Sequence, residues 1–230
     1  MVRIAASIAL WFIIWHSCVM LRNLALSAMV LALATGCASA RLTVPDRQDQ
    51  FWAALSSHCG NAYAGTLVSD DAADAYMRGA HMVMHIRECS ATQISIPFHI
   101  QQPDGVWDRS RTWLLTRTGT GLHLKHDHRH PDGNSDVMTL YGGDTVTTGS
   151  ARAQAFAVDA DSIAMFEREG RSASVTNVWH VEVDPVDASS PQFSYALRRS
   201  VATGAPADRH FRVEFDLSRR VETPPAPWGY

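Results

Sequence analysis

The sequence lacks the short motifs that mark several large enzyme classes. It contains no GxSxG motif, no GxxxxGK[ST] motif, and no GxGxxG motif after a strand-like segment. These absences argue against an α/β-hydrolase, a P-loop nucleotide hydrolase and a Rossmann-type dehydrogenase. The HExxH motif of zinc proteases and the HxHxDH order of metallo-β-lactamase-like hydrolases are absent as well.

Acidic residues are missing from one part of the chain, residues 1–36, which contain two arginines and no Asp or Glu. The remaining 194 residues therefore carry 18 basic and 23 acidic side chains, a net charge of −5. A general nucleic-acid binder needs clustered Lys and Arg for phosphate contacts, so we expect no nucleic-acid partner.

Two apolar runs occupy the N-terminal segment. Residues 4–21 form the first, Arg22 and Asn23 interrupt it, and the second ends at Cys37. Translation from Met20 gives an ordinary export signal with a short basic start and an apolar stretch of about a dozen residues. We therefore predict that residues 1–36 are a signal segment whose true start is Met20. The alternative is a membrane-spanning helix over 4–21, which is just long enough.

The residues Leu33-Ala34-Thr35-Gly36-Cys37 resemble the lipobox of bacterial lipoproteins, with Ala34 where Leu is usual. The resemblance implies that Cys37 becomes the lipidated mature N-terminus and anchors the protein to the inner or outer membrane, facing the periplasm. The alternative is cleavage after the A-x-A site at residues 38–40, which releases a soluble periplasmic or secreted protein.

Cysteine is scarce, with four residues in 230. If Cys18 is removed with the signal and Cys37 is lipidated, only Cys59 and Cys89 remain. A leftover pair in an exported protein is most simply a disulfide. The alternative is a Cys/His metal site that uses His58 or His85, but the CxxC spacing of zinc motifs is absent.

Most of the body alternates between apolar and polar residues with period two, as in antiparallel strands with one buried face. The clearest examples are residues 94–100, 179–184 and 210–217. Similar runs occur near residues 63–69, 81–89, 111–118, 121–129, 137–146, 153–158 and 192–201. About ten strands at short spacing predict an all-β antiparallel barrel, with a sandwich as the alternative. Pro97 should lie at an edge or a bulge of its strand.

The predicted organisation is simple. A polar linker covers residues 37–50, a barrel domain covers 51–218, and a Pro-rich tail at 219–230 crosses the surface. Short helices are expected at residues 46–58, where Asp46 can cap the N-terminus, and at 70–78 and 161–169.

At the level of architecture, a short Trp-containing helix followed by many antiparallel strands resembles the lipocalin-type barrels. The chain also resembles uncharacterised bacterial exported proteins and lipoproteins, through Cys59-Gly60-x-Ala62-Tyr63-x-Gly65, residues 110–113, residues 124–133 and residues 141–145. That resemblance covers most of the mature chain and implies no activity.

The most unusual stretch is residues 123–130, HLKHDHRH. If the alternation set by Leu122 and Leu124 continues, His126, His128 and His130 point inward. Histidines at i and i+2 on a strand project in parallel about 6.5–7 Å apart and can share a metal ion.

A catalytic metal would need another protein ligand, and the chain offers His130, Asp132, Asp144 or Glu88. This pattern defines an alternative function, a metal-dependent hydrolase that uses His126 and His128 and a divalent metal as cofactor. General acid–base chemistry and a plain hydrogen-bonded ladder at a strand end are the other interpretations.

Two arginines fall on predicted inward faces. Arg111 shares its face with Trp113, and Arg199 extends the face of Tyr195. If both approach His126 and His128, they form a cationic site for a carboxylate or phosphate group. Otherwise these arginines reach solvent or pair with Asp108 and Asp144.

We therefore expect an exported, lipid-anchored barrel that binds a small anionic or amphiphilic ligand at Arg111, His126, His128 and Arg199, and that is a binding protein rather than an enzyme. A purely structural envelope protein is the third class, and it would have an interior filled with side chains.

Overall fold

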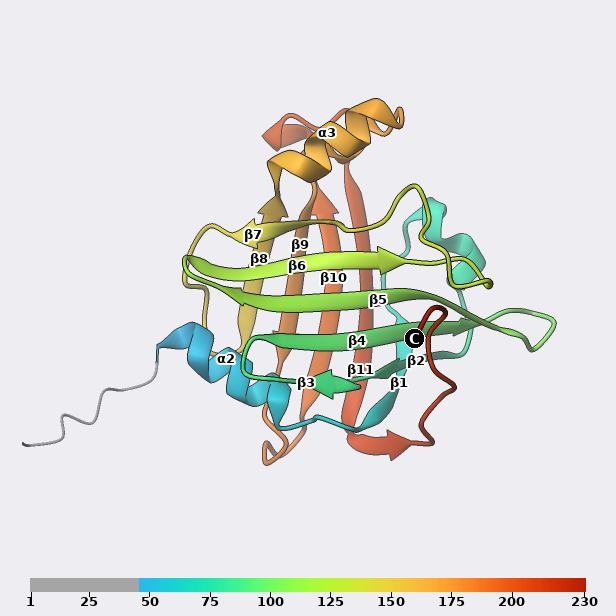
Figure 1. Ribbon diagram of the computed structural model, residues 1–230, viewed down its shortest axis with the longest axis vertical. Helices are drawn as coiled ribbons and strands as arrows, with labels where there is room; N and C mark the ends of the chain where they lie inside the picture. Colours follow the sequence, from blue (N-terminus) through green and yellow to red (C-terminus); the bar gives the residue numbers. More distant parts are fainter. Residues whose placement is uncertain (1–45) are drawn as a thin grey trace, which may run out of the picture. The chain divides into compact units, whose positions relative to one another are not determined.

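The computed structural model describes residues 46–230, in which eleven strands form a single antiparallel sheet. The strand order is β2-β1-β11-β10-β9-β8-β7-β6-β5-β4-β3, and β2 also pairs with β4. That pairing closes ten strands into a barrel and leaves β3 as an extra strand beside β4. The predicted all-β barrel is confirmed over the sandwich. Strands β4–β6 run steeply across β9–β11 (Figure 1), as in orthogonal barrels.

The strands have the following bounds: β1 Ala62–Leu67, β2 Met82–His85, β3 Glu88–Cys89, β4 Gln93–Gln101, β5 Trp107–Thr118, β6 Gly121–His128, β7 Tyr141–Thr145, β8 Ala153–Val158, β9 Val178–Val183, β10 Gln192–Arg199 and β11 Arg209–Val221. The helices are α2 Arg47–Ser56 and α3 Ala160–Arg168, with 3-10 turns η1 Ala72–Met77, η2 Ser172–Thr176 and η3 Val201–Thr203.

Several predicted segments differ in extent. The 137–146 run forms a strand only from Tyr141, because residues 136–140 turn back toward β6. The 81–89 run is divided between β2 and β3, and the expected helix at 70–78 is a 3-10 turn over Ala72–Met77. Pro97 lies where β4 has no partner on one side, between its pairings with β3 and β2, so it removes no ladder hydrogen bond.

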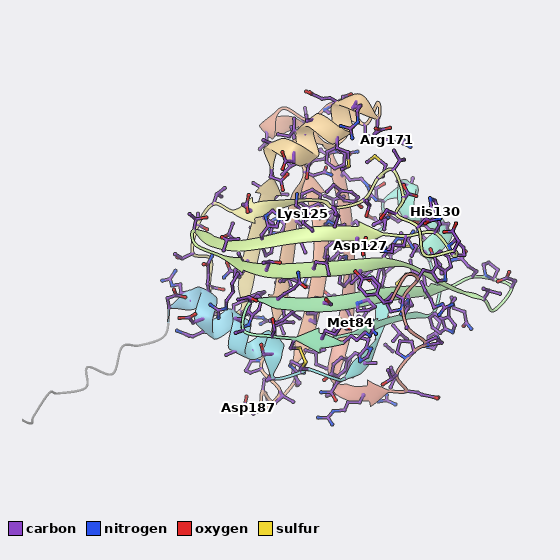
Figure 2. All side chains as sticks on the ribbon, in the orientation of Figure 1. Met84, Lys125, Asp127, His130, Arg171 and Asp187 are labelled. Atoms are coloured by element: carbon purple, nitrogen blue, oxygen red, sulfur yellow. A yellow bond between two sulfur atoms is a disulfide. The ribbon has the colours of Figure 1, made fainter. Side chains whose placement is uncertain are left out.

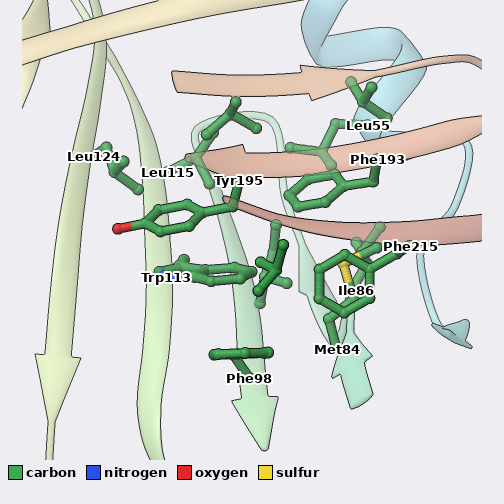
Figure 3. Packing of buried hydrophobic residues seen from close by; sticks show 14 of the residues in the cluster. Leu55, Met84, Ile86, Phe98, Trp113, Leu115, Leu124, Phe193, Tyr195 and Phe215 are labelled. Atoms are coloured by element: carbon green, nitrogen blue, oxygen red, sulfur yellow. The ribbon is translucent and has the colours of Figure 1, made fainter. Parts of the chain in front are cut away.

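Alternating apolar side chains fill part of the barrel with a stack of aromatic rings. The Trp113 ring stacks on Phe98 at 4.9 Å and on Tyr195 at 4.3 Å between centroids. Phe193 and Phe215 extend the packing toward helix α2 (Figure 3). Each buried aromatic side chain removes about 150–250 Å² from water, so this stack contributes much of the free energy of folding.

Helix α2 covers one end of the barrel. The Asp46 carboxylate accepts a hydrogen bond from the Asp49 N–H at 2.7 Å, which confirms the predicted cap. Phe51 and Leu55 are completely buried against the core.

The segment after α2 is fixed by the disulfide between Cys59 and Cys89, whose Cα atoms are 6.2 Å apart. The Nε2 of His58 lies 2.8 Å from the carbonyl of Asp184, and its Nδ1 lies 2.9 Å from the Tyr63 hydroxyl. Both cysteines and both ring nitrogens of His58 are therefore occupied, and the disulfide is confirmed over the Cys/His metal site.

At the other end, helix α3 and the 3-10 turns η1 and η2 lie over the strand ends (Figure 1). Strand β7 fits between β6 and β8 only because it contains two glycines. A Cβ at Gly142 would lie 1.8 Å from the Leu124 carbonyl oxygen, and one at Gly143 would lie 1.9 Å from that of Ala157. Only glycine allows this approach.

The C-terminal residues cross the outer face of the barrel near strands β4 and β5 (Figure 1). The Trp228 N–H donates to the Arg109 carbonyl at 3.1 Å, and the Arg109 guanidinium donates to the Ala226 carbonyl at 2.8 Å. The tail ends with the Tyr230 hydroxyl 2.5 Å from the Asp127 carboxylate.

Candidate ligand-binding cavity

A cavity of about 320 Å³ lies at the end of the barrel away from α2. Its lining is largely aromatic, and the Phe, Trp and Tyr residues come from eight different elements. These aromatic residues are Tyr76, Phe98, Trp113, Tyr141, Phe166, Trp179, Tyr195 and Phe211. The volume falls at the lower end of the range of about 300–1,000 Å³ for small-molecule sites.

Strands β5 and β6 bring three of the predicted site residues into this cavity. Arg111 is directly opposite His128 in the β5–β6 register, and Trp113 is opposite His126. All four side chains line the cavity, because period-two alternation places them on the inner face of neighbouring strands. The predicted inward direction of Arg111, His126 and His128 therefore matches the structure.

His126 is one of the buried polar residues of the cavity. Its Nδ1 lies 3.0 Å from the carbonyl oxygen of Tyr141, which can only accept, so Nδ1 carries the proton. Its Nε2 is then an acceptor for the Tyr195 hydroxyl at 2.6 Å. Burial and the neighbouring His128 lower the pKa of His126 to about 3, so the ring is neutral at physiological pH. Neither nitrogen has a free lone pair for a metal ion.

His128 lies nearer the opening. Its Nε2 is 3.2 Å from the Tyr141 hydroxyl. Burial, together with the charge of Arg111, lowers the pKa of His128 to about 4. Burial also raises the pKa of Tyr141 to about 12, so this pair is neutral and can exchange hydrogen bonds with a ligand.

Three arginines supply positive charge around the cavity. Arg111 pairs with Asp108, which the sequence analysis gave as the alternative to a cationic site. The Arg111 side chain nevertheless lines the cavity. Arg209 is bound by Asp71 at 2.9 Å and by the buried Asp74 at 2.5 Å.

The third arginine, Arg171, follows helix α3 and is exposed (Figure 2). It has no ion pair among the described residues. The cavity therefore has one uncompensated cation, and it stands at the opening.

Arg199 does not join the other three predicted residues. It lines a separate cleft with Arg198 and His210, and its Nη1 lies 3.4 Å from Asn177 Oδ1, at the back of the cavity wall. The prediction that Arg199 points into the barrel is wrong. Strand β10 ends at Arg199, and its long side chain extends beyond the barrel interior.

His130 also lies outside the cavity, contrary to the predicted inward face. Strand β6 ends at His128, and the turn that follows leaves the His130 side chain 54% exposed, with Nε2 3.7 Å from Asp136 (Figure 2). Asp132 is exposed in the same turn. Glu88 is exposed on β3 and pairs with its neighbour Arg87. None of these residues can complete a metal site with His126 and His128.

Within residues 46–230, one group has the ligand spacing for a metal ion, and it is formed by His123, Asp144 and Asp159. His123 Nδ1 is 2.6 Å from Asp144, and the Lys125 ammonium is 2.7 Å from Asp159. A lysine this close neutralises the carboxylate that a cation would need, so we interpret the group as an ion-pair network that attaches α3 to the barrel.

Sequence reasoning missed several residues of the cavity. Tyr141, Phe166, Arg171 and Trp179 belong to different elements that only the closed topology brings together. Tyr195 was recognised as inward-facing, but its bond to His126 spans 69 positions and has no local signal.

Searches with protein-family models and against curated proteins found no match to this sequence. None of the helices formed by residues 46–230 has the length and apolar character needed to cross a bilayer. The predicted signal segment and Cys37 lie outside the described residues.

Proposed function

We propose that this protein is an exported bacterial envelope protein, anchored through a lipid on Cys37, whose barrel binds a small anionic or amphiphilic ligand. The observation that carries the binding part is the aromatic cavity with Arg111 and Arg171 at its side. Aromatic walls favour a flat apolar body, and guanidinium groups favour a carboxylate or phosphate.

The geometry favours binding over the two alternatives. A metal-dependent hydrolase would need a free nitrogen on His126, and both nitrogens are engaged. A purely structural barrel would have a filled interior, whereas here the aromatic stack fills one end and a cavity occupies the other.

The polar groups also limit how a ligand can bind. The Tyr195 proton is directed at His126, so the oxygen of Tyr195 can only accept a further hydrogen bond. Arg111 and Arg171 can only donate. A ligand with an anionic end toward the arginines and an apolar body over Trp179 would satisfy this pattern.

The test compares two ligands of one shape, 2-naphthoate and its uncharged analogue 2-naphthamide, by isothermal titration calorimetry. We expect one molecule of naphthoate per chain and binding of the amide at least tenfold weaker. Arg171→Gln should weaken naphthoate binding about tenfold, since a charge-assisted hydrogen bond contributes about 1.5 kcal/mol.

The matched control is Arg219→Gln, which removes an exposed arginine of β11 that does not line the cavity. It should bind naphthoate like the wild type. Equal affinity for the two ligands, or no binding of either, would contradict the proposal.

Export and lipidation are supported by the Leu33–Cys37 segment and by the disulfide, which is typical of proteins in an oxidising compartment. Mass spectrometry of the mature protein from membranes tests this part. We expect an N-terminal diacylglyceryl cysteine, lost in Cys37→Ala. A mature chain that begins at Arg41 without lipid would contradict it.

A further inference from the structure

A second hollow, separate from the barrel cavity, lies where β10 turns through η3 into β11. It has a volume of about 570 Å³. Five basic side chains line it: His180, Arg198, Arg199, Arg209 and His210. Arg209 also lines the barrel cavity and is paired with Asp71 and Asp74, and the other four take no part in the function proposed above.

Arg199 is the partly buried basic residue of this cleft whose charge is not matched by a nearby carboxylate. It is partly buried, it has no ion pair among the described residues, and its nearest acceptor is Asn177 Oδ1 at 3.4 Å. Its Nε is buried without a partner. In the β10–β11 register it is directly opposite Arg209, and burial together with Arg209 lowers its pKa. A guanidinium group in such a place needs an acceptor.

Two other polar groups of the same cleft lack partners. Thr176 Oγ1 and His210 Nε2 are buried without a hydrogen bond, so three of the six such atoms in the described chain belong to residues of this one cleft. Buried polar groups are nearly always paired, and each exception calls for a bound water or ion. Arg199 Nε can only donate a hydrogen bond, and the Thr176 hydroxyl and the His210 ring can also donate, so an acceptor in the cleft would satisfy all three groups.

The carboxylates of the cleft are engaged elsewhere or exposed. Asp71 is bound to Arg209 and accepts from the backbone N–H groups of Ala73 and His210. Asp208 is exposed and accepts from the Val201 N–H at 2.8 Å. Asp70 is exposed, where water and salt screen its charge. None of the three carboxylates forms an ion pair with Arg199 in the described chain.

We propose that this cleft binds a tetrahedral oxyanion, a phosphate or sulfate group, through the guanidinium groups of Arg199 and Arg198, with Thr176 and His210 donating from its wall. Two arginines on neighbouring positions of one strand end can donate from two sides to the several oxygens of such a group. The group can come from free phosphate or from a phospholipid headgroup.

Calorimetric titration of the whole purified chain with inorganic phosphate, at an ionic strength held constant with sodium chloride, tests the proposal. We expect saturable binding that Arg199→Gln weakens at least tenfold. Arg198→Gln should weaken it severalfold, and because Arg198 is exposed this second variant keeps the fold. Arg219→Gln is again the control. Far-UV circular dichroism checks folding, and 2-naphthoate should bind the Arg199 variant normally.

A second titration with glycerophosphoglycerol, a soluble phosphodiester headgroup, distinguishes the two sources. Arginine-dependent binding of phosphate alone assigns the site to a phosphate monoester or free phosphate, and stronger binding of the diester assigns it to a lipid headgroup. The proposal is overturned if neither compound binds in excess of chloride. It is also overturned if both arginine variants bind these compounds as tightly as the wild type.

Discussion

The hydroxyl of Tyr195 on β10 lies 2.6 Å from Nε2 of His126 on β6, across the interior of the barrel. The two residues are 69 positions apart, and His126 Nδ1 is held at the same time by the Tyr141 carbonyl. This bond fixes the tautomer of a buried neutral histidine and sets the direction of the Tyr195 proton. It joins strands β6 and β10 on opposite sides of the barrel, within the lining of the proposed binding site.

Removal of the Tyr195 hydroxyl should destabilise the protein. In Tyr195→Phe, the buried His126 Nε2 loses its donor, and an unsatisfied buried group costs about 1–3 kcal/mol. Urea unfolding should show a free energy of unfolding lower by that amount. Tyr76→Phe is the control, because Tyr76 is 62% exposed and its hydroxyl can reach water. Equal losses in the two variants would contradict this role of Tyr195.

Stability should fall as the pH falls below about 6.5. Burial lowers the pKa of His99 to about 4, of His126 to about 3 and of His128 to about 4. The unfolded chain, with histidine pKa values near 6.5, therefore binds more protons than the folded chain between about pH 6.5 and pH 4.

In that range each of these histidines lowers the free energy of unfolding by up to about 1.4 kcal/mol per pH unit. Urea unfolding at pH 7, 6 and 5 measures the slope, and NMR should show no titration of His126 above pH 5. A stability that is unchanged from pH 7 to pH 5 is incompatible with this account.

The disulfide should contribute substantially to stability. Cys59 and Cys89 are 30 positions apart, and a loop of that size corresponds to about 3–4 kcal/mol in the chain-entropy model. The pair Cys59→Ala and Cys89→Ala should lower the melting temperature by several degrees. An unchanged melting temperature would show that the bond does not restrain the unfolded chain as expected.

The C-terminal tail should be held largely by Asp127. This carboxylate is 2% exposed and accepts from the Tyr230 hydroxyl, the Arg129 guanidinium and the Thr139 hydroxyl. Tyr230→Phe removes one hydrogen bond to a buried charge and should cost about 1–3 kcal/mol. Hydrogen exchange should become faster in residues 226–230. If exchange there and the free energy of unfolding both stay at wild-type values, the bond does not fix the tail.

Period-two alternation predicted the barrel and most of the site. It placed Arg111, His126 and His128 on inner faces, because each lies within a strand whose parity is set by buried neighbours. It failed for His130, which lies beyond the end of β6, and for Arg199, the last residue of β10. At strand ends the chain turns, and parity no longer fixes the direction of a side chain.

The remaining features depend on contacts between distant segments. No local sequence pattern predicts the contacts of Tyr141 with Phe166 and Trp179. These contacts depend on the order of the strands in the closed sheet. Asp127 alternates with His126 and His128 and so lies on the outer face of β6, but its burial could not be predicted, because the tail that covers it lies about one hundred positions further along the chain.

The location of a bound ligand tests the central claim most directly. In crystals grown with 4-bromobenzoate, the account predicts an anomalous bromine peak inside the cavity, next to Trp179 and Tyr141, with the carboxylate directed toward Arg111 and Arg171. A cavity that stays empty while the protein binds the compound elsewhere, or side chains that fill the space in the crystal, would contradict the account.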